Sequence, residues 1–138
     1  MTRTGLPPIV LSRRDHDRLS KLLDGAAATL DAAEYLEREI VRARIVDDDA
    51  VPPNVVTMHS RLEYSDDRNG ERRVVTLVYP GEQDIAQGRI SVLTPVGAAL
   101  LGLSVGQSIE WRTRAGAWYS LTIRELLSQP PAEDPPRQ

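Results

Sequence analysis

The stretch from Ile90 to Trp111 constrains the fold most tightly, because residue type specifies each junction between its expected elements. Thr94 suits the N-cap of a helix. Pro95 suits the first helical position, where the N–H that proline lacks would have no partner inside the helix. Gly102 is a C-terminal stop for that short helix. The segment therefore predicts a strand, a brief helix, a turn and a second strand, and its residues form no nucleophile, general base or metal-ligand set.

Two amphipathic helical patterns occupy residues 12–46. Ser12 with Asp15 three residues later resembles a capping box, and Asp31 with Glu34 gives a second N-cap signal. Two consecutive helices joined by a short loop predict an antiparallel helical hairpin. At ~1.5 Å per residue, arms of roughly 12 and 15 residues reach only about 18–23 Å.

The segment from Asp47 to Pro53 separates this hairpin from a region of strand patterns. Its three aspartates oppose the negative end of a helix dipole, so the second helix is expected to end by Val46. Beyond the prolines, apolar and polar residues alternate from Val56 to Tyr64, and Asn69-Gly70 closes a turn that leads into the next strand.

The sheet is expected to contain four antiparallel strands covered by one helix, which makes the chain an α+β protein. The strands are expected at about 56–64, 73–79, 108–112 and 118–126. Trp111 and Trp118 are expected to form a cross-strand pair or to cover the helix. The predicted organisation is an N-terminal arm at 1–11, a helical hairpin at 12–46, a linker at 47–53, a sheet domain at 54–127 and a disordered tail at 128–138.

Composition narrows the possible functions. The chain of 138 residues has a net charge of -3, which offers no basic surface for direct, sequence-specific DNA binding. It has no cysteine, so disulfides and thiolate metal sites are excluded. The N-terminal apolar run, Ile9 to Leu11, is too short for a signal peptide or a membrane span. A cytoplasmic protein without membrane contact is therefore expected.

No catalytic residue, cofactor site or metal site is expected. His16 and His59 fall in different predicted units, and neither has a second ligand at metal spacing. Gly97, Gly102 and Gly106 lack the spacing of a phosphate-binding loop. These absences predict that the chain is not an enzyme.

The motif from Ser91 to Gln107 resembles the C-terminal domain of the bacterial transcript-cleavage factors GreA and GreB, with Gln107 where those factors usually carry aspartate. Val55 to Arg61 and Val75 to Pro80 resemble the Rnk branch of that superfamily, whose name refers to regulation of nucleoside diphosphate kinase. The resemblance covers roughly Ile9 to Leu127. It implies a short helical hairpin followed by a GreA/GreB-type domain, similar in fold to the FK506-binding proteins (FKBP-like).

The resemblance also implies a non-catalytic transcription regulator that binds RNA polymerase at the secondary channel and competes with Gre-type factors. Effects on nucleoside diphosphate kinase would then be indirect, through gene expression. In the Gre factors, the surface at the start of the short helix docks at the rim of the channel, which points here to Thr94, Pro95 and Val96. The candidate charged contacts at the rim are Arg61, Arg89 and Arg112.

Three alternatives remain open. Direct protein–protein regulation would make nucleoside diphosphate kinase itself the partner. Transcript cleavage would use carboxylates at the hairpin tip, where Asp24 and Asp31 flank the loop, to hold Mg²⁺ as the Gre factors do. The short arms argue against cleavage, and Asp31 also suits an N-cap while Asp24 suits a solvated helix end. Prolyl isomerase activity has only the fold in its favour, because a chain without phenylalanine has few aromatics to line such a pocket.

Overall fold

A five-stranded sheet forms the C-terminal half of the computed structural model, which describes residues 9–25, 31–112, 116 and 118–129. The sheet contains β3 (Arg61–Asp66), β4 (Glu71–Val78), β5 (Arg89–Ser91), β6 (Ser108–Arg112) and β7 (Trp118–Ser128), in the order β5-β4-β3-β7-β6.

The sheet is mixed, which corrects the prediction of antiparallel strands alone. β3 pairs antiparallel with β4 and with β7, and β6 pairs antiparallel with β7. β5 runs parallel to β4, because the loop from Tyr79 to Gly88, with its short 3-10 helix η2 (Ile85–Gln87), returns the chain before β5 begins. The register pairs Trp111 with Tyr119 and Arg112 with Trp118, so the predicted pairing of the two tryptophans is wrong by one position.

The short helix α3 (Pro95–Leu100) begins and ends as the sequence predicts. The Thr94 hydroxyl accepts a hydrogen bond from the Gly97 amide at 3.0 Å, and proline occupies the first helical position. A Cβ at Gly97 would collide with the Ser91 carbonyl oxygen, so only glycine lets α3 lie this close to the end of β5. Gly102 follows the helix with a φ of +81°.

The helical hairpin consists of α1 (Arg13–Gly25) and α2 (Asp31–Arg42). Two short strands, β1 (Val10–Ser12) and β2 (Arg44–Val46), flank it and pair in parallel, with Leu11 opposite Ile45. The second helix is shorter than the sequence predicted, because the residues after Arg42 pair with β1 instead of continuing the helix. A second 3-10 helix, η1 (Asp48–Ala50), leads toward the sheet.

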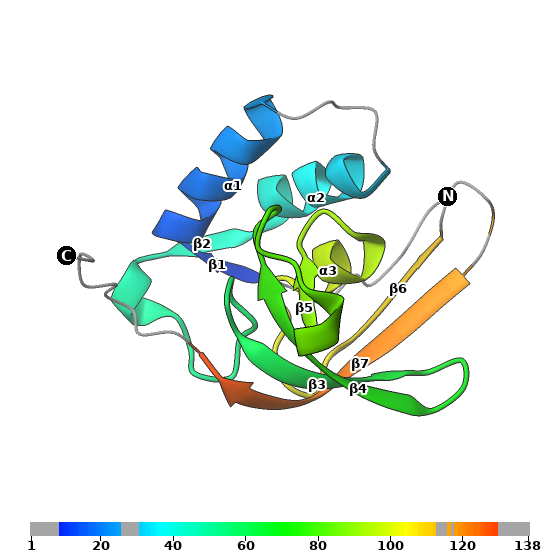
Figure 1. Ribbon diagram of the computed structural model, residues 1–138. Helices are drawn as coiled ribbons and strands as arrows, with labels where there is room; N and C mark the ends of the chain where they lie inside the picture. The colour runs from blue at the N-terminus through cyan, green and yellow to red at the C-terminus, as the bar shows by residue number, and fades with distance from the viewer. Residues whose placement is uncertain (1–8, 26–30, 113–115, 117, 130–138) are drawn as a thin grey trace.

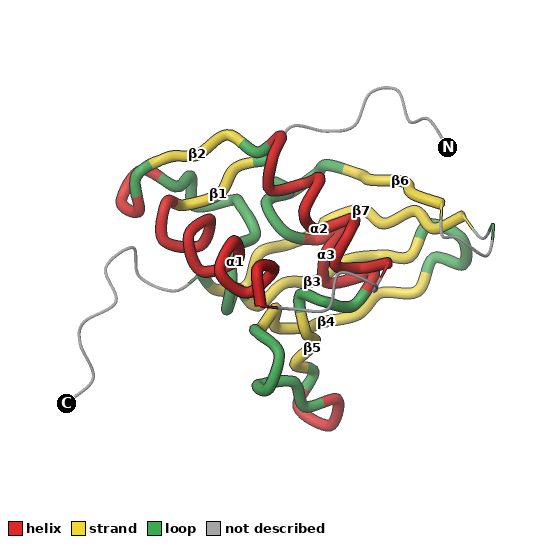
Figure 2. Tube along the Cα trace, turned by 90° about the horizontal axis from the view of Figure 1, so that it is seen from above, coloured by secondary structure: helices red, strands yellow, loops and turns green. Residues whose placement is uncertain are grey.

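The elements form layers, with α3 on the sheet and the hairpin on α3 (Figure 1). Seen from above, α2 lies next to α3, and β1 and β2 lie beside the start of α1 (Figure 2). One apolar cluster runs through all the layers. Fully or almost fully buried members from the successive layers include Leu19, Leu36, Leu100, Leu62 and Leu121. The hairpin therefore shares its core with the sheet domain.

Candidate functional site

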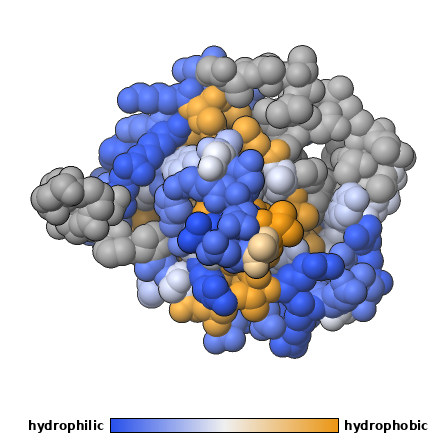
Figure 3. All heavy atoms as spheres, viewed as in Figure 1, coloured by the Kyte–Doolittle hydropathy of each residue, from blue (hydrophilic) through white to orange (hydrophobic). Residues whose placement is uncertain are grey.

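An open hollow of about 490 Å³ lies beside the start of α3. Its apolar and aromatic lining includes Tyr64, Val75, Ile85, Ile90, Val96 and Tyr119. Register places Val75 opposite Leu62, a fully buried residue, so the hollow lies on the face of the sheet that the helices cover. An apolar patch lies over α3 in the middle of this view of the surface, with polar side chains around it (Figure 3).

Two of the three residues predicted at the start of α3 line this hollow. Thr94 lies at its edge, with its hydroxyl donating to the Ser91 carbonyl at 2.8 Å while capping α3. Val96 is half-buried and packs against the core. Pro95 starts α3, but its side chain lies outside what the structure describes. The capping bonds hold the wall in one conformation, so a partner contacting it would meet a preformed surface.

Charged groups stand around the hollow. The Arg68 guanidinium lies 4.3 Å from the centre of the Tyr119 ring, a cation–π contact, and donates two hydrogen bonds to the Asp66 carboxylate at 3.0 and 3.2 Å. These bonds lower the pKa of Asp66. Arg73, which lines the hollow itself, pairs with Glu71 at 3.1 Å. The rim therefore offers guanidinium groups beside an apolar floor.

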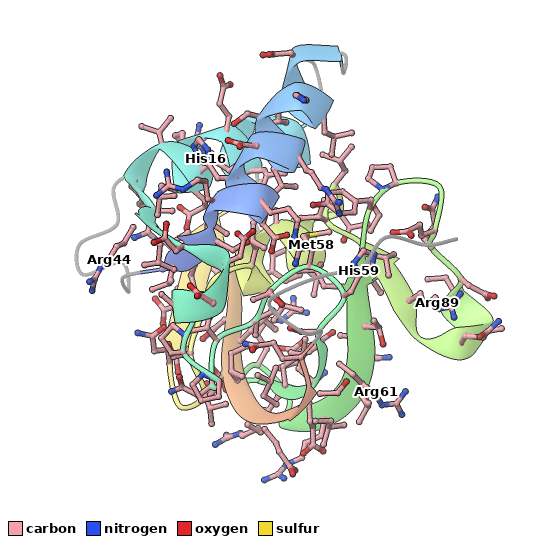
Figure 4. All side chains as sticks on the ribbon, turned by 90° about the vertical axis from the view of Figure 1, so that its left-hand side faces the viewer. His16, Arg44, Met58, His59, Arg61 and Arg89 are labelled. Atoms are coloured by element: carbon pink, nitrogen blue, oxygen red, sulfur yellow. The ribbon has the colours of Figure 1, made fainter. Side chains whose placement is uncertain are left out.

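The predicted arginine contacts are separated from this hollow. Arg61 is opposite Thr76, and Thr76 is opposite Arg89, so the two arginines share one row across β3, β4 and β5. The neighbouring Leu62 is fully buried, which places this row on the outer face of the sheet. Figure 4 shows Arg61 and Arg89 on the sheet side of the molecule, away from the hairpin. Arg112 is at the end of β6, with its side chain outside the described atoms.

The hairpin tip is the other predicted site. Asp24 is exposed in the last turn of α1, and Asp31 is the first residue of α2, with a side chain outside the described part. Helices of 13 and 12 residues extend roughly 20 and 18 Å at ~1.5 Å per residue. Among the described residues, no group of three or more His, Cys, Asp or Glu side chains could hold a metal ion. None of the described helices has the length and apolar character of a membrane span.

Sequence reasoning missed the wall of the hollow opposite α3. Ile85 is 80% exposed, although it lines the hollow, and Tyr64 and Tyr119 come from strands distant in sequence. Ile85 did carry a signal, because it is a single large apolar residue in the otherwise polar stretch from Glu82 to Gly88. The two tyrosines carried none, since only the register of β3 and β7 brings them beside α3.

Comparisons with known proteins agree with the fold. Residues 51–127 match the family model described as transcription elongation factor, GreA/GreB, C-terminal, and residues 7–46 match the model described as Rnk N-terminus. The chain is 42% identical over 127 residues to the "Regulator of nucleoside diphosphate kinase" of Escherichia coli (strain K12), covering 91% of this chain and 93% of that protein.

More distant relatives and a solved structure extend the match. The transcription elongation factor GreA of Christiangramia forsetii is 33% identical over 75 residues, which is 54% of this chain and 48% of that protein. A solved structure titled "Prokaryotic transcription elongation factor GreA/GreB from Nitrosomonas europaea" has a TM-score of 0.69 and 39% identity, covering 87% of this chain and 98% of that one.

Proposed function

The chain belongs to the GreA/GreB family, with an N-terminus of the Rnk type, and from that premise we propose that it binds RNA polymerase at the rim of the secondary channel as a non-catalytic regulator. Its relatives are named as regulators or elongation factors, not as catalysts. The sheet domain would anchor at the rim while the hairpin occupies the entrance. It would then compete with Gre-type factors for one docking position.

The hollow beside α3 is the observation that carries this proposal. Ile85 is 80% exposed at its wall, and Val96 and Tyr119 complete an apolar surface with guanidinium groups at its edge. Apolar side chains at the centre with polar groups around them match the core-and-rim arrangement of protein interfaces. The predicted contacts Thr94 and Val96 belong to this surface, whereas Arg61 and Arg89 would contact a partner only if it also reached the outer face of the sheet.

The hairpin supports the non-catalytic part of the proposal. Its helices span roughly 20 Å, as their residue counts give at ~1.5 Å per residue. A hairpin of this length would stop short of an active centre that the long Gre coiled coil reaches. We therefore propose that Asp24 and Asp31 occupy the entrance without holding the catalytic Mg²⁺, and that the expression of nucleoside diphosphate kinase changes indirectly.

One alternative has a specific observation in its favour. The Escherichia coli relative is named a regulator of nucleoside diphosphate kinase, and that name also suits a protein that binds the enzyme directly. The same apolar hollow would then be the contact surface. The two candidates differ in which protein binds the hollow, RNA polymerase or nucleoside diphosphate kinase.

A matched pair of variants tests the proposal. Ile85→Ser removes an apolar contact from the hollow, and Val41→Ser removes an equally exposed one from the base of α2, both side chains being 80% exposed. Binding of the fluorescently labelled chain to core RNA polymerase would be followed by anisotropy. Burying an isoleucine is worth about 1.5–3 kcal/mol, so Ile85→Ser should weaken binding roughly 10- to 100-fold, while Val41→Ser should bind like the native chain.

The outcomes separate the candidates. Saturable binding to RNA polymerase that Ile85→Ser weakens and Val41→Ser preserves supports docking through the hollow. Equal binding by both variants contradicts the hollow as the contact surface. If the native chain binds purified nucleoside diphosphate kinase and not RNA polymerase, the direct-regulator alternative replaces the proposal.

A further inference from the structure

A buried carboxylate joins the first helix to the sheet domain, away from the hollow. Asp15 is 7% exposed, and its Oδ2 accepts a hydrogen bond from the Met58 amide at 3.1 Å, across 43 positions of sequence. The Asp15 amide donates to Ser12 Oγ at 3.0 Å, which caps α1. One residue therefore belongs both to the start of α1 and to the contact between that helix and the sheet domain.

The turn that presents the Met58 amide is fixed independently of α1. The Ser60 amide donates to the Thr57 carbonyl, and the Thr57 amide donates to Ser60 Oγ at 2.9 Å. The His59 amide donates to the Leu77 carbonyl at 2.6 Å, which ties the turn to β4. His59 has a φ of +68°, a conformation that non-glycine residues hold only where the surroundings impose it. The amide therefore points at Asp15 from a rigid support.

The side chain of His59 adds a second tie between this turn and the end of β4. Its Nε2 lies 2.9 Å from Glu82 Oε1, and its ring contacts the Tyr79 ring edge-on at 5.6 Å. Figure 4 shows Met58 and His59 where α1 meets the sheet domain. The turn at residues 57–60 is thus held in place by the end of β4 on one side and contacts α1 on the other.

The other contacts of α1 are the link through β1, whose Val10 amide donates to the Gly102 carbonyl at 3.1 Å, apolar packing, and bonds to the linker. Leu19 is fully buried, with Leu22 and Leu23 packed against the same core, but apolar contacts are non-directional. Asp47 and Asp48 hold the helix start through Arg13 and the Arg14 amide, yet these aspartates belong to the linker. A hydrogen bond to the turn at residues 57–60, in contrast, weakens steeply when its geometry changes.

Burying the Asp15 carboxylate has a desolvation cost, and removing it would leave the buried Met58 amide without its acceptor. Burial raises the pKa of Asp15 even though the Met58 hydrogen bond and the nearby positive charges of Arg14 and Arg18 act to lower it. Removing one partner of a buried hydrogen bond is costly, because the other partner is left unsatisfied. The bond therefore ties the start of α1 to the Met58 amide at the cost of burying a carboxylate.

We propose that Asp15 is a positioning residue that fixes the direction in which α1 leaves the sheet domain. The hairpin tip at Asp24 is nine residues further along α1, which is about 14 Å at ~1.5 Å per residue, so a tilt of about 15° at Asp15 displaces the tip by roughly 4 Å. Under the proposed function, this direction determines whether the tip enters the channel when the sheet domain docks. The structural part of the inference does not depend on that function.

Distance measurement between two spin labels tests the inference on the free protein. The chain has no cysteine, so Lys21→Cys on α1 and Glu125→Cys on β7, both at exposed positions, give one defined pair. Asp15→Leu removes the acceptor while keeping apolar volume, Asp15→Ala removes it with less volume, and Asp15→Asn retains a carbonyl acceptor. Urea unfolding of the same proteins identifies variants that are fully folded.

The native chain and Asp15→Asn should each give one narrow distance. Folded Asp15→Leu or Asp15→Ala should give a distribution broadened by about 2 Å or more, since the Lys21 label lies about 9 Å beyond Asp15 along the helix. A folded variant without the acceptor that keeps the native distribution overturns the inference, as does equal broadening in Asp15→Asn. Because RNA polymerase is absent from this measurement, a failure of polymerase binding refutes the proposed function and leaves the positioning role intact.

Discussion

Replacing Gly102 with alanine tests whether the N-terminal strand packs on the sheet domain as described. Gly102 has a φ of +81°, and a Cβ added there would lie 2.7 Å from Ile9 Cβ. Gly106 has a similar φ of +93°, but a Cβ there would have no neighbour within 4 Å. The two glycines therefore separate backbone strain from contact with the N-terminal strand.

The magnitudes follow from these two environments. A left-handed conformation costs an L-residue about 1–2 kcal/mol, so Gly106→Ala should lose about that much. Gly102→Ala carries the same strain and also overpacks the site against Ile9, which typically adds ~1–3 kcal/mol. At a urea m-value of about 2 kcal/mol per M, the two variants should differ in unfolding midpoint by roughly 1 M.

Urea unfolding followed by circular dichroism measures both variants under the same conditions. The loss of unfolding free energy caused by Gly102→Ala should be smaller when Ile9 is also changed to glycine, because that change removes the colliding Cβ. A double-mutant cycle measures this coupling. Equal losses in Gly102→Ala and Gly106→Ala, or no coupling to Ile9, would refute the packing of Ile9, the residue before β1, against the end of α3.

Three further predictions concern single residues. Gly97→Ala should destabilise the fold by about 1–3 kcal/mol in urea unfolding, against the usual helix preference for alanine, because its Cβ would collide with the Ser91 carbonyl; an unchanged or higher midpoint would contradict this. Burial raises the pKa of Asp15 in the folded state, so ionising this carboxyl lowers the free energy of unfolding. The stability of Asp15→Asn relative to the native chain should therefore increase as pH rises from the ordinary aspartate range through the folded pKa, and a pH-independent difference in urea midpoint would contradict this. His59→Val should lose at least about 1–2 kcal/mol at its φ of +68°, whereas His59→Gly should lose less, and equal thermal midpoints would argue against that backbone conformation.

Local chemistry made much of the fold predictable. The segment around Thr94, Pro95 and Gly102 specifies a helix start and stop through residue types with few other uses, and the structure has α3 where that pattern predicts it. The amphipathic periodicity of residues 12–46 likewise indicated two helices. These features depend on residues within a few positions of one another, which a single sequence reveals.

The features that were missed depend on pairing between distant segments. β1, β2 and β5 are three residues each, too short for a periodic pattern, and each forms only because a partner strand lies beside it. Of the residues that line the hollow, only Thr94 and Val96 were predicted as contacts, since Tyr64 and Tyr119 reach the hollow through the pairing of distant strands. The bond from Asp15 to Met58 left no local signal, because Asp15 also fits an ordinary first helical turn.

Competition for RNA polymerase tests the central claim most directly. The chain, labelled through an introduced Lys21→Cys, would be bound to core RNA polymerase and titrated with unlabelled GreA, with anisotropy as the readout. If the two proteins share one docking position, GreA should displace the labelled chain completely. The apparent affinity of the labelled chain for RNA polymerase should then weaken in proportion to the GreA concentration. A ternary complex that retains the labelled chain at saturating GreA would contradict the account.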